Sequence, residues 1–277
     1  MNDILTSCWG MTNLDEVFKD ALVIIDPQND FCARAGSLYV DGAEEDIIRL
    51  ASHISRDWAR YSDVFVSLDS HDVMAVFHSG FWLDDNGFNP KLFTSITESD
   101  YRSGKLKTSV PAYECYAERI FGAMARKNVS SLMVWPEHCV VSTWGHAIAD
   151  PLIQALNVWR GATLKPVRYI FKGENPYTEQ FSIFEGLDDG WPDTAFNKNL
   201  CDVLSAYNSV TFAGEALSHC VEASVSSYVR HGGDAVSRQK KFVLSDCSSP
   251  VSGFDRTECE RSLSSIGVVF VSSNNRF

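Results

Sequence analysis

The chain has 277 residues, of which 45% are hydrophobic and 22% are charged, and its formal net charge is −12. This composition is typical of a soluble protein with enough apolar residues for a packed core. The acidic balance and the lack of a basic run argue against a nucleic-acid partner, because such binding depends on cationic patches that neutralise phosphates. No apolar run approaches the roughly 18 residues of a membrane span. We therefore expect neither a nucleic-acid partner nor a membrane partner.

The cysteines and the first residues indicate a reducing compartment. The eight cysteines include no Cys-x-x-Cys pair, which argues against a thiolate zinc site, and they are too sparse for a disulfide scaffold. The first five residues, Met1 to Leu5, lack the basic stretch and apolar run of a secretory signal. Together these observations predict a cytoplasmic protein whose thiols are mostly inert.

Short apolar runs rich in β-branched residues recur along the chain, and helical patterns separate several of them. Predicted strands cover residues 21–25, 63–68, 132–135, 167–171, 210–213, 242–244 and 268–271. Because these runs are apolar throughout, they are typical of a sheet that is covered on both faces. Predicted helices cover residues 43–60, 150–159, 200–207, 219–231 and 256–266. The alternation predicts a three-layer α/β/α fold around a mostly parallel central sheet.

The stretch from about 79 to 124 interrupts this alternation. It is rich in aromatic residues, among them Phe81, Trp82 and Tyr113, and no shift in composition marks a linker on either side. A long ordered excursion of this kind is more typical of a packed insertion or lid than of a second domain. We therefore expect one domain over residues 1–277, with an insertion or lid at about 79–124.

Reactive side chains follow five of the predicted strands. They are Asp26, Asp69 with His71, His138, Lys172 and Cys220. Ligands of open α/β sheets bind at the carboxyl ends of the strands, so these side chains are candidates for one site. Each also has a structural explanation, since aspartates commonly cap helices or form turns and buried cysteines commonly fill cores. All of those explanations would have to hold together at one edge of the sheet, which favours a common site.

Cys220 has the placement that a nucleophile needs. It lies in the first turn of the helix predicted from residue 219, where the helix dipole favours a thiolate. A nearby ammonium, Lys172, is expected to lower the pKa of this thiol further. Free backbone N–H groups in the same turn could hold an oxyanion, and Asp26 could pass the thiol proton to a leaving amine. This set predicts acyl transfer through a thioester.

A second group of side chains is suited to a metal ion. Asp69 and His71 are two residues apart, so an extended backbone points both side chains in the same direction. With His138 they offer one carboxylate and two imidazoles, which suits Zn²⁺, Fe²⁺ or Mn²⁺ with open positions for water or a ligand. We expect a divalent metal ion, Zn²⁺ ahead of Fe²⁺ or Mn²⁺. His78 is either a fourth ligand or an anchor of the insertion.

These segments resemble the isochorismatase-like cysteine hydrolases, and among them the nicotinamidases and pyrazinamidases. The matching segments are 24–31, 67–71, 135–139, 171–173 and 214–221, in the same order along the chain. The resemblance runs from about residue 21 to residue 271 and implies the isochorismatase-like hydrolase fold. It implies a catalytic triad of Asp26, Lys172 and Cys220, and a metal held by Asp69, His71 and His138.

The same resemblance implies how a substrate is held. It implies a cis peptide between Glu215 and Ala216, which turns the N–H groups of Ala216 and Cys220 toward one point as an oxyanion hole. It also implies that the metal holds the pyridine nitrogen of nicotinamide while the thiol attacks the carboxamide. The aromatic side chains of Phe31 and Trp135 would stack against the ring.

The chain departs from the family pattern in two places. Ser142 stands where the family commonly has the glycine of a Gly-Thr pair, and the bulky Trp144 follows closely. Both are expected to reshape the floor of the pocket, and the 79–124 stretch is expected to cover its mouth. These departures are expected to change which substrate the pocket accepts and not the reaction that the site catalyses.

The expected function is metal-dependent hydrolysis of nicotinamide to nicotinate and ammonia through a thioester on Cys220. One alternative keeps the triad but acts on another small amide, such as an N-carbamoyl compound or a ureide. A second alternative is a non-catalytic protein that binds a ligand on the same scaffold. The expected partner is a small-molecule amide substrate, and the resemblance leaves a homo-oligomer open because relatives commonly associate.

Overall fold

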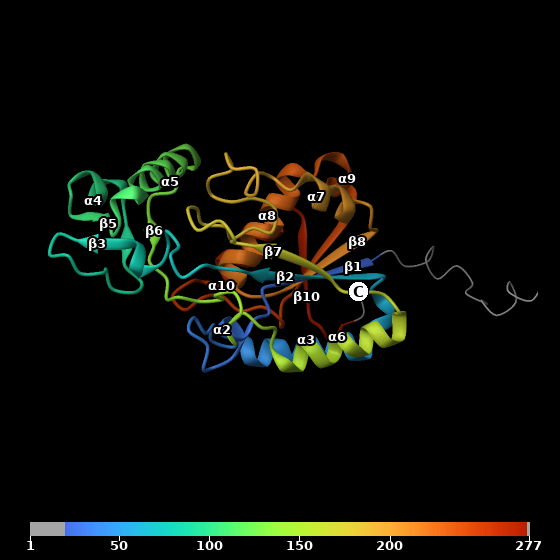
Figure 1. Cartoon of the computed structure of the whole chain (residues 1–277). Coiled ribbons are helices and arrows are strands. Elements are labelled where there is room, and N and C mark those ends of the chain that lie inside the picture. Colours follow the sequence, from blue (N-terminus) through green and yellow to red (C-terminus); the bar gives the residue numbers. More distant parts are fainter. Residues whose placement is uncertain (1–19, 276–277) are drawn as a thin grey trace, which may run out of the picture.

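The computed structural model describes residues 20–275, and a six-stranded parallel sheet forms its centre (Figure 1). The strands, in the order in which they lie side by side, are β10 (Val268–Val271), β9 (Lys240–Leu244), β8 (Ser209–Gly214), β1 (Asp20–Ile25), β2 (Asp63–Asp69) and β7 (Arg168–Lys172). All neighbouring pairs in this sheet are parallel. The predicted fold class is therefore confirmed.

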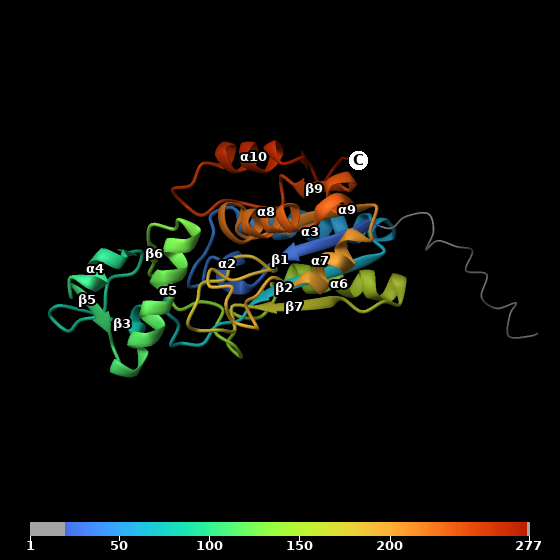
Figure 2. The same ribbon diagram turned by 90° about the horizontal axis from the view of Figure 1, so that it is seen from above.

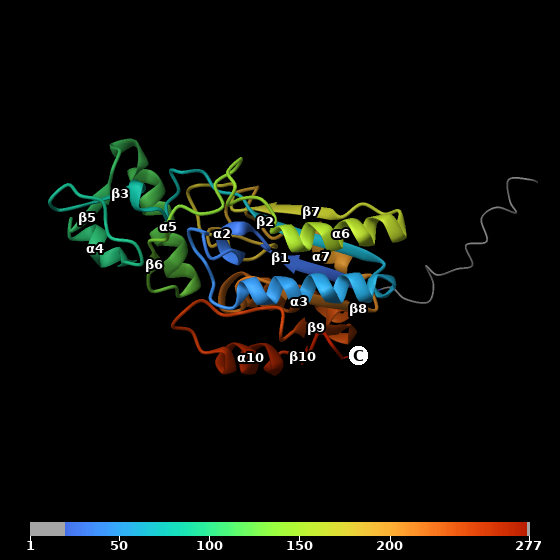
Figure 3. The ribbon, with the colours of Figure 1, turned by 90° about the horizontal axis from the view of Figure 1, so that it is seen from below.

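Helices cover both faces of the sheet. One face carries α3 (Ala43–Arg56) and α6 (Asp150–Thr163), and the other carries α7 (Lys198–Ser205), α8 (Glu222–His231) and α10 (Arg256–Ser265), with the short α9 (Gly233–Arg238) after α8. Alternate residues of a strand point to opposite faces. Leu22 and Ile24 of β1 accordingly belong to the apolar cluster with α3 and α6, whereas Ala21 and Val23 belong to the other cluster. Figures 2 and 3 show the two layers from opposite sides.

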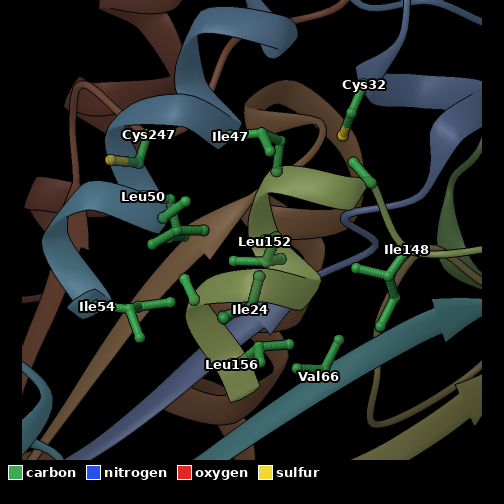
Figure 4. Packing of buried hydrophobic residues seen from close by; sticks show 14 of the residues in the cluster. Ile24, Cys32, Ile47, Leu50, Ile54, Val66, Ile148, Leu152, Leu156 and Cys247 are labelled. Carbon is green, nitrogen blue, oxygen red and sulfur yellow. The ribbon is translucent and has the colours of Figure 1, made fainter. Parts of the chain in front are cut away.

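The layer formed by α3 and α6 illustrates how the sequence makes these helices. Apolar residues of α3 recur at intervals of three and four residues, which places them on one side of the helix. They meet apolar residues of α6 and of the strands in a closely packed cluster (Figure 4). The labelled members are Ile24, Cys32, Ile47, Leu50, Ile54, Val66, Ile148, Leu152, Leu156 and Cys247. The predicted helix at 43–60 ends earlier, at Arg56, and a short 3-10 helix (Trp58–Arg60) follows.

The predicted strand at 132–135 does not belong to the main sheet. The structure has only β6 (Leu132–Met133) there, which pairs antiparallel with β4 (Ser95–Ile96). Leu132 and Val134 are apolar because they are buried in the cluster of the 79–124 excursion, not because they lie in a covered sheet. A second correction concerns β7, which lies at the edge of the sheet and is largely exposed from Arg168 to Phe171.

The 79–124 stretch projects beyond the carboxyl ends of the strands (Figures 1 and 2). Its elements are β3 (Trp82–Asp84), β4, α4 (Glu98–Arg102), β5 (Leu106–Thr108) and α5 (Glu114–Lys127), with 3-10 turns at Ser79–Phe81 and Pro111–Tyr113. Its aromatic residues pack into an apolar cluster of their own, which includes Phe81, Trp82 and Phe121. Arg119 and Arg126 of α5 form ion pairs with the buried Asp188. The division of the chain into one domain with an insertion stays a prediction.

None of the helices within residues 20–275 is long and apolar enough to cross a membrane. The seven cysteines in this part of the chain form no disulfide. Cys8 and the first residues, on which the prediction about a secretory signal depends, lie outside the described residues.

Candidate active site

The register of the sheet brings polar side chains to one edge. Asp26 directly follows β1, and β2 and β7 end at Asp69 and Lys172, which lie opposite each other in the strand pairing. Asp26 has a φ of 44°, in the left-handed region that residues other than glycine rarely adopt. Such backbone strain is concentrated at functional sites.

Lys172 connects the predicted triad to the predicted metal ligands. Its Nζ lies 2.9 Å from Asp26 Oδ2, 2.9 Å from Asp69 Oδ1 and 3.6 Å from Cys220 Sγ. All four side chains are buried. The three residues predicted to act as a triad are thus brought together, and the ammonium pairs with a carboxylate in each of the two groups.

Burial decides the protonation of this cluster. It raises the pKa of the Cys220 thiol well above its usual range, and the nearby Lys172 opposes this rise without reversing it. The prediction of a lowered thiol pKa is therefore wrong, because it considered the ammonium and the helix dipole but not the loss of solvent. Burial also raises the pKa of Asp26, against the influence of Lys172. The resting thiol consequently keeps its proton and needs a base.

The turn that carries Cys220 differs in detail from the predicted helix start. A π-helical turn (Leu217–Val221) comes first, and α8 continues from Glu222. The peptide bond between Glu215 and Ala216 is cis, as the resemblance implied. Ala216 and Cys220 both line the pocket described below.

Asp69, His71 and His138 form a second buried group. Each offers one ligand atom, and these three atoms all lie within 4.8 Å of one another. The Nε2 atoms of His71 and His138 lie 3.1 Å and 4.0 Å from Asp69 Oδ2. Burial lowers the pKa of His138 to about 3, so this ring is neutral, as metal-binding imidazoles are.

Backbone carbonyls orient both rings toward the aspartate. His71 Nδ1 donates a hydrogen bond to the carbonyl of Gly173 at 3.0 Å, and His138 Nδ1 donates one to the carbonyl of Pro136 at 2.7 Å. This leaves Nε2 of both rings directed at Asp69, the orientation that metal-binding histidines usually have. Burial opposes the charge of His71, but the Asp69 carboxylate raises the pKa of this ring overall. A Cβ on Gly173 would lie 2.5 Å from the His71 ring, so a side chain there would obstruct the group.

His78 lies near this group but outside it. Its ring centre is 5.9 Å from that of His71 and 5.6 Å from that of His138. Its Nδ1 bonds to the carbonyl of Val73 at 3.0 Å, and its buried Nε2 has no hydrogen-bond partner among the described residues.

The loop that delivers His138 is held by Asp30 of the short helix α2 (Asn29–Cys32). Asp30 Oδ2 accepts a hydrogen bond from Cys139 N at 2.7 Å, and Oδ1 accepts one from Ser37 N at 3.0 Å. A Cβ on Gly145 would lie 1.9 Å from the Asp30 carboxylate, so the loop can approach this closely only with a glycine there. His138 is therefore placed by loop contacts and by the isolated β-bridge between His71 and Val140, and not by a strand of the main sheet.

Two further residues, Ser67 and Gln28, were not among the predicted site residues but hold Asp26 and Asp69 in place. Ser67 Oγ donates to Asp26 Oδ1 at 2.6 Å and accepts from Asp26 N at 3.0 Å. The Gln28 amide exchanges two hydrogen bonds of 2.7 Å with the backbone of Asp69. The period of two could have identified Ser67, because it precedes Asp69 by two residues within β2. It could not have identified Gln28, because the backbone is not extended at Asp26, after the end of β1.

A pocket opens over these groups. Phe31 and Trp135 line it, together with Asp69, His138 and Cys220. Six further lining residues were not predicted, namely Leu38, Val40, Glu179, Phe181, His219 and Val251. Burial raises the pKa of Glu179 to about 7, and the Trp135 indole donates a hydrogen bond to its carboxylate at 3.2 Å.

The expected effects of Ser142, Trp144 and the 79–124 stretch on this pocket are not seen. Ser142 and Trp144 are not among the residues that line it, and Trp144 is 56% exposed. Trp144 lies instead on the outer side of the loop, where its carbonyl accepts a hydrogen bond from the Asn29 side chain at 2.8 Å. No residue from 79 to 124, all of which are described, lines the pocket either.

Comparison with known proteins found relatives of one kind, although no family model matches the chain. A nicotinamidase of Saccharomyces cerevisiae is 26% identical over 234 residues, which are 83% of this chain and 88% of the relative. The structure of the yeast nicotinamidase Pnc1p bound to the inhibitor nicotinaldehyde has a TM-score of 0.65 at 22% identity and covers 91% of this chain and 99% of its own. The pyrazinamidase of Pyrococcus horikoshii in complex with zinc has a TM-score of 0.53 at 18% identity and covers 92% and 99%. The resemblance found in the sequence motifs is confirmed.

Proposed function

We propose that this chain, a relative of the nicotinamidases in sequence and in fold, hydrolyses nicotinamide to nicotinate and ammonia through a thioester on Cys220. The observation that carries the proposal is the position of the Lys172 ammonium, within 2.9 Å of the carboxylates of Asp26 and Asp69 and 3.6 Å from the Cys220 sulfur. It joins a nucleophile, a base and a metal-binding carboxylate in one buried unit, which is what a metal-assisted amidohydrolase requires.

The first half of the reaction forms the thioester. Asp26 accepts the proton of Cys220 while the sulfur attacks the amide carbon, and backbone N–H groups of Ala216 and Cys220 hold the oxyanion. The C–N bond then breaks, and Asp26 gives the proton to the leaving ammonia. Lys172 offsets the negative charge throughout, because the Asp26 and Asp69 carboxylates raise its pKa well above the usual range despite its burial.

The second half returns the free enzyme. Asp26 accepts a proton from a water molecule that attacks the thioester carbon, and the C–S bond breaks as nicotinate forms. The proton on Asp26 passes to the sulfur of Cys220. The short hydrogen bond from Ser67 fixes the carboxylate in the position that both proton transfers use.

The donor set of Asp69, His71 and His138 fits a divalent metal ion, because both imidazoles are held with Nε2 toward the carboxylate. We assign these three residues as the ligands and Zn²⁺ as the ion, with Fe²⁺ or Mn²⁺ as alternatives. His78 is a candidate fourth ligand, since its buried Nε2 has no partner among the described residues. When bound, the ion would hold the pyridine nitrogen, while Phe31 and Trp135 stack on the ring.

The remaining assignments concern the whole protein. The chain acts as one hydrolase domain in which the stretch at about 79–124 is an insertion, and this is supported by the ion pairs of Arg119 and Arg126 with Asp188. We assign it to the cytoplasm, with a small-molecule amide as its partner. A homo-oligomer is compatible with this function.

A substrate panel tests the proposal. Purified protein of known metal content would be given nicotinamide, an N-carbamoyl amino acid and a ureide in parallel, and ammonia and the acid product would be measured separately. We expect equimolar ammonia and nicotinate from nicotinamide and little product from the other two. Turnover of only the carbamoyl compound or the ureide would replace nicotinamide by another amide. Tight binding of nicotinamide without any product would favour a binding protein.

A further inference from the structure

A second cavity adjoins the catalytic pocket. It is a cleft of about 360 Å³ that shares Trp135, Glu179, Phe181 and His219 with the pocket as common walls. The segment from Lys127 to Met133 forms one side of it, and α8 forms the other. Figure 1 shows where α5, β6 and α8 lie in the fold. These shared side chains place the two cavities next to each other, so a substituent of a molecule bound in the catalytic pocket that passes between them would enter the cleft.

The walls of the cleft are mainly apolar. Leu132 and Met133 face it from β6, Leu187 from the loop before α7, Ala223 from α8 and Phe254 from the loop before α10. His219 packs edge-on against Phe254, with ring centres 4.6 Å apart, and against Phe181 at 5.3 Å. An apolar group placed here would leave water for a surface of carbon atoms, which is favourable roughly in proportion to the area buried.

The charged residues at the outer end of the cleft compensate one another. Glu185 lies 3.8 Å from the ammonium of Lys127 and 3.7 Å from the guanidinium of Arg230, and Lys127 also pairs with Asp189 at 3.1 Å. The cations Lys127 and Arg230 thus face the carboxylate of Glu185 in the lining, and Asp189 pairs with Lys127 from outside the lining. This end offers no excess charge to attract an ionic group, so the chemistry of the cleft favours an uncharged, apolar occupant.

We propose that the cleft binds an alkyl substituent on the ring of the substrate, so that the enzyme accepts alkyl-substituted pyridine carboxamides as well as nicotinamide. This inference rests on the proposed function, because the carboxamide must lie at Cys220 for the substituent to reach the cleft. The reaction is unchanged: water supplies the oxygen of the new acid, the C–N bond breaks, and ammonia leaves. The cleft contributes to recognition alone.

The proposal predicts a graded effect of chain length. Each methylene that enters an apolar environment is worth about four-fold in binding, so kcat/KM should rise about four-fold per carbon from methyl to ethyl to propyl at the ring position that faces the cleft. Nicotinamides substituted at carbon 5 and at carbon 6 would be assayed as two separate series. We expect one series to show this rise.

Variants that fill the cleft make the test specific. Ala223→Phe would occupy it from α8, and Val129→Trp would occupy it from the opposite, partly exposed edge, so one of them remains informative if the other folds poorly. Ala125→Phe is the matched control, because Ala125 is an exposed alanine of α5 that lines neither cavity. We expect the filling variants to lower kcat/KM for the propyl compound at least about ten-fold and for nicotinamide less than about two-fold.

Each other result has a defined meaning. Equal losses for nicotinamide and the propyl compound would make the cleft an access route and overturn the proposal. Hydrolysis of nicotinamide without hydrolysis of either substituted series would overturn this inference alone. Hydrolysis of none of the compounds would overturn the proposed function and this inference together, whereas hydrolysis of only the substituted compounds would support the cleft assignment and replace nicotinamide as the substrate.

Discussion

The two groups of the active site reach the same edge of the sheet in different ways. Asp26 and Lys172 come from the ends of strands, and Cys220 comes from the turn that follows β8, so the register of the parallel sheet places the triad. In the metal-binding group only Asp69 has that origin, because His138 is brought in by a loop that hydrogen-bonds to Asp30. The triad thus depends on the ends of regular strands, and the metal-binding group depends on a loop that is held by Asp30 and by backbone hydrogen bonds to His71.

Lys172 is the residue on which both groups depend, and its removal should have the largest effect. Lys172→Met leaves the buried carboxylates of Asp26 and Asp69 without their cation, which should lower the free energy of unfolding by about 3 to 5 kcal/mol and abolish turnover. Urea denaturation measures the first effect. Lys198→Met is the control, since its pair with Asp202 is on the surface and worth about 1 kcal/mol or less. Equal losses in the two variants would contradict this role of Lys172.

A change in Ser67 separates the triad from the metal-binding group. Ser67→Ala removes a 2.6 Å hydrogen bond to the Asp26 carboxylate, and hydrogen bonds to charged groups contribute about 1.5 to 3 kcal/mol. We expect kcat to fall by roughly ten-fold to a hundred-fold, while bound metal per chain stays the same. Steady-state assays with metal analysis of the same samples check both parts, and a loss of metal in parallel with kcat would show that the two groups are not separable.

A change in Asp30 should affect the metal-binding group and leave the triad unchanged. Asp30→Ala removes one contact of the loop that carries His138, while the backbone bonds of this loop to His71 remain. Metal affinity should therefore fall by about ten-fold, the lower end of what is lost when a residue that positions a metal ligand is changed. Excess metal should restore the activity, because the triad is untouched. Equilibrium dialysis measures the affinity, with the exposed Asp41→Ala as control. Activity that stays low at saturating metal would show that Asp30 also supports the triad.

The difference between residues placed by strand ends and residues placed by loops also explains which features the sequence could predict. The apolar runs of β1, β2 and β8 predicted their strands, and Asp26, Lys172 and Cys220 follow from where strands end. The run at 132–135 was wrongly predicted to be a strand of the main sheet. An apolar stretch that packs into an aromatic cluster has the same sequence pattern as a buried strand. Single-sequence periodicity does not separate these cases for so short a run.

Other features depend on contacts between distant segments. The raised pKa of the Cys220 thiol is a consequence of burial, which no local pattern reports. Glu179, Phe181 and His219 line the pocket because the loop after β7 and the turn after β8 fold toward each other. Trp144 was expected near the pocket from its proximity in sequence, whereas its loop turns that side chain outward.

His219 belongs to neither group and gives the smallest predicted effect. Burial lowers its pKa from 6.5 to about 4 in the folded protein, so the unfolded chain binds a proton at a higher pH than the folded one. The stabilisation is complete above about pH 6.5 and is lost as the pH falls toward 4, with about 1 kcal/mol lost between pH 7 and pH 5.5. Urea unfolding of the wild type and of His219→Gln across this range measures the difference in slope. The same pH dependence of the free energy of unfolding in both proteins would contradict the lowered pKa of His219.

The most direct test of the account compares the wild type with Cys220→Ala, both loaded with metal and given nicotinamide, while ammonia and nicotinate are measured together. Loss of a nucleophile costs on the order of a million-fold in a well-studied hydrolase, so the variant should release neither product above background although its metal content is unchanged. Cys201→Ala changes a buried thiol of α7 that belongs to the apolar core, and this variant should retain activity. Nicotinate formation by Cys220→Ala at a rate near that of the wild type would contradict the central claim.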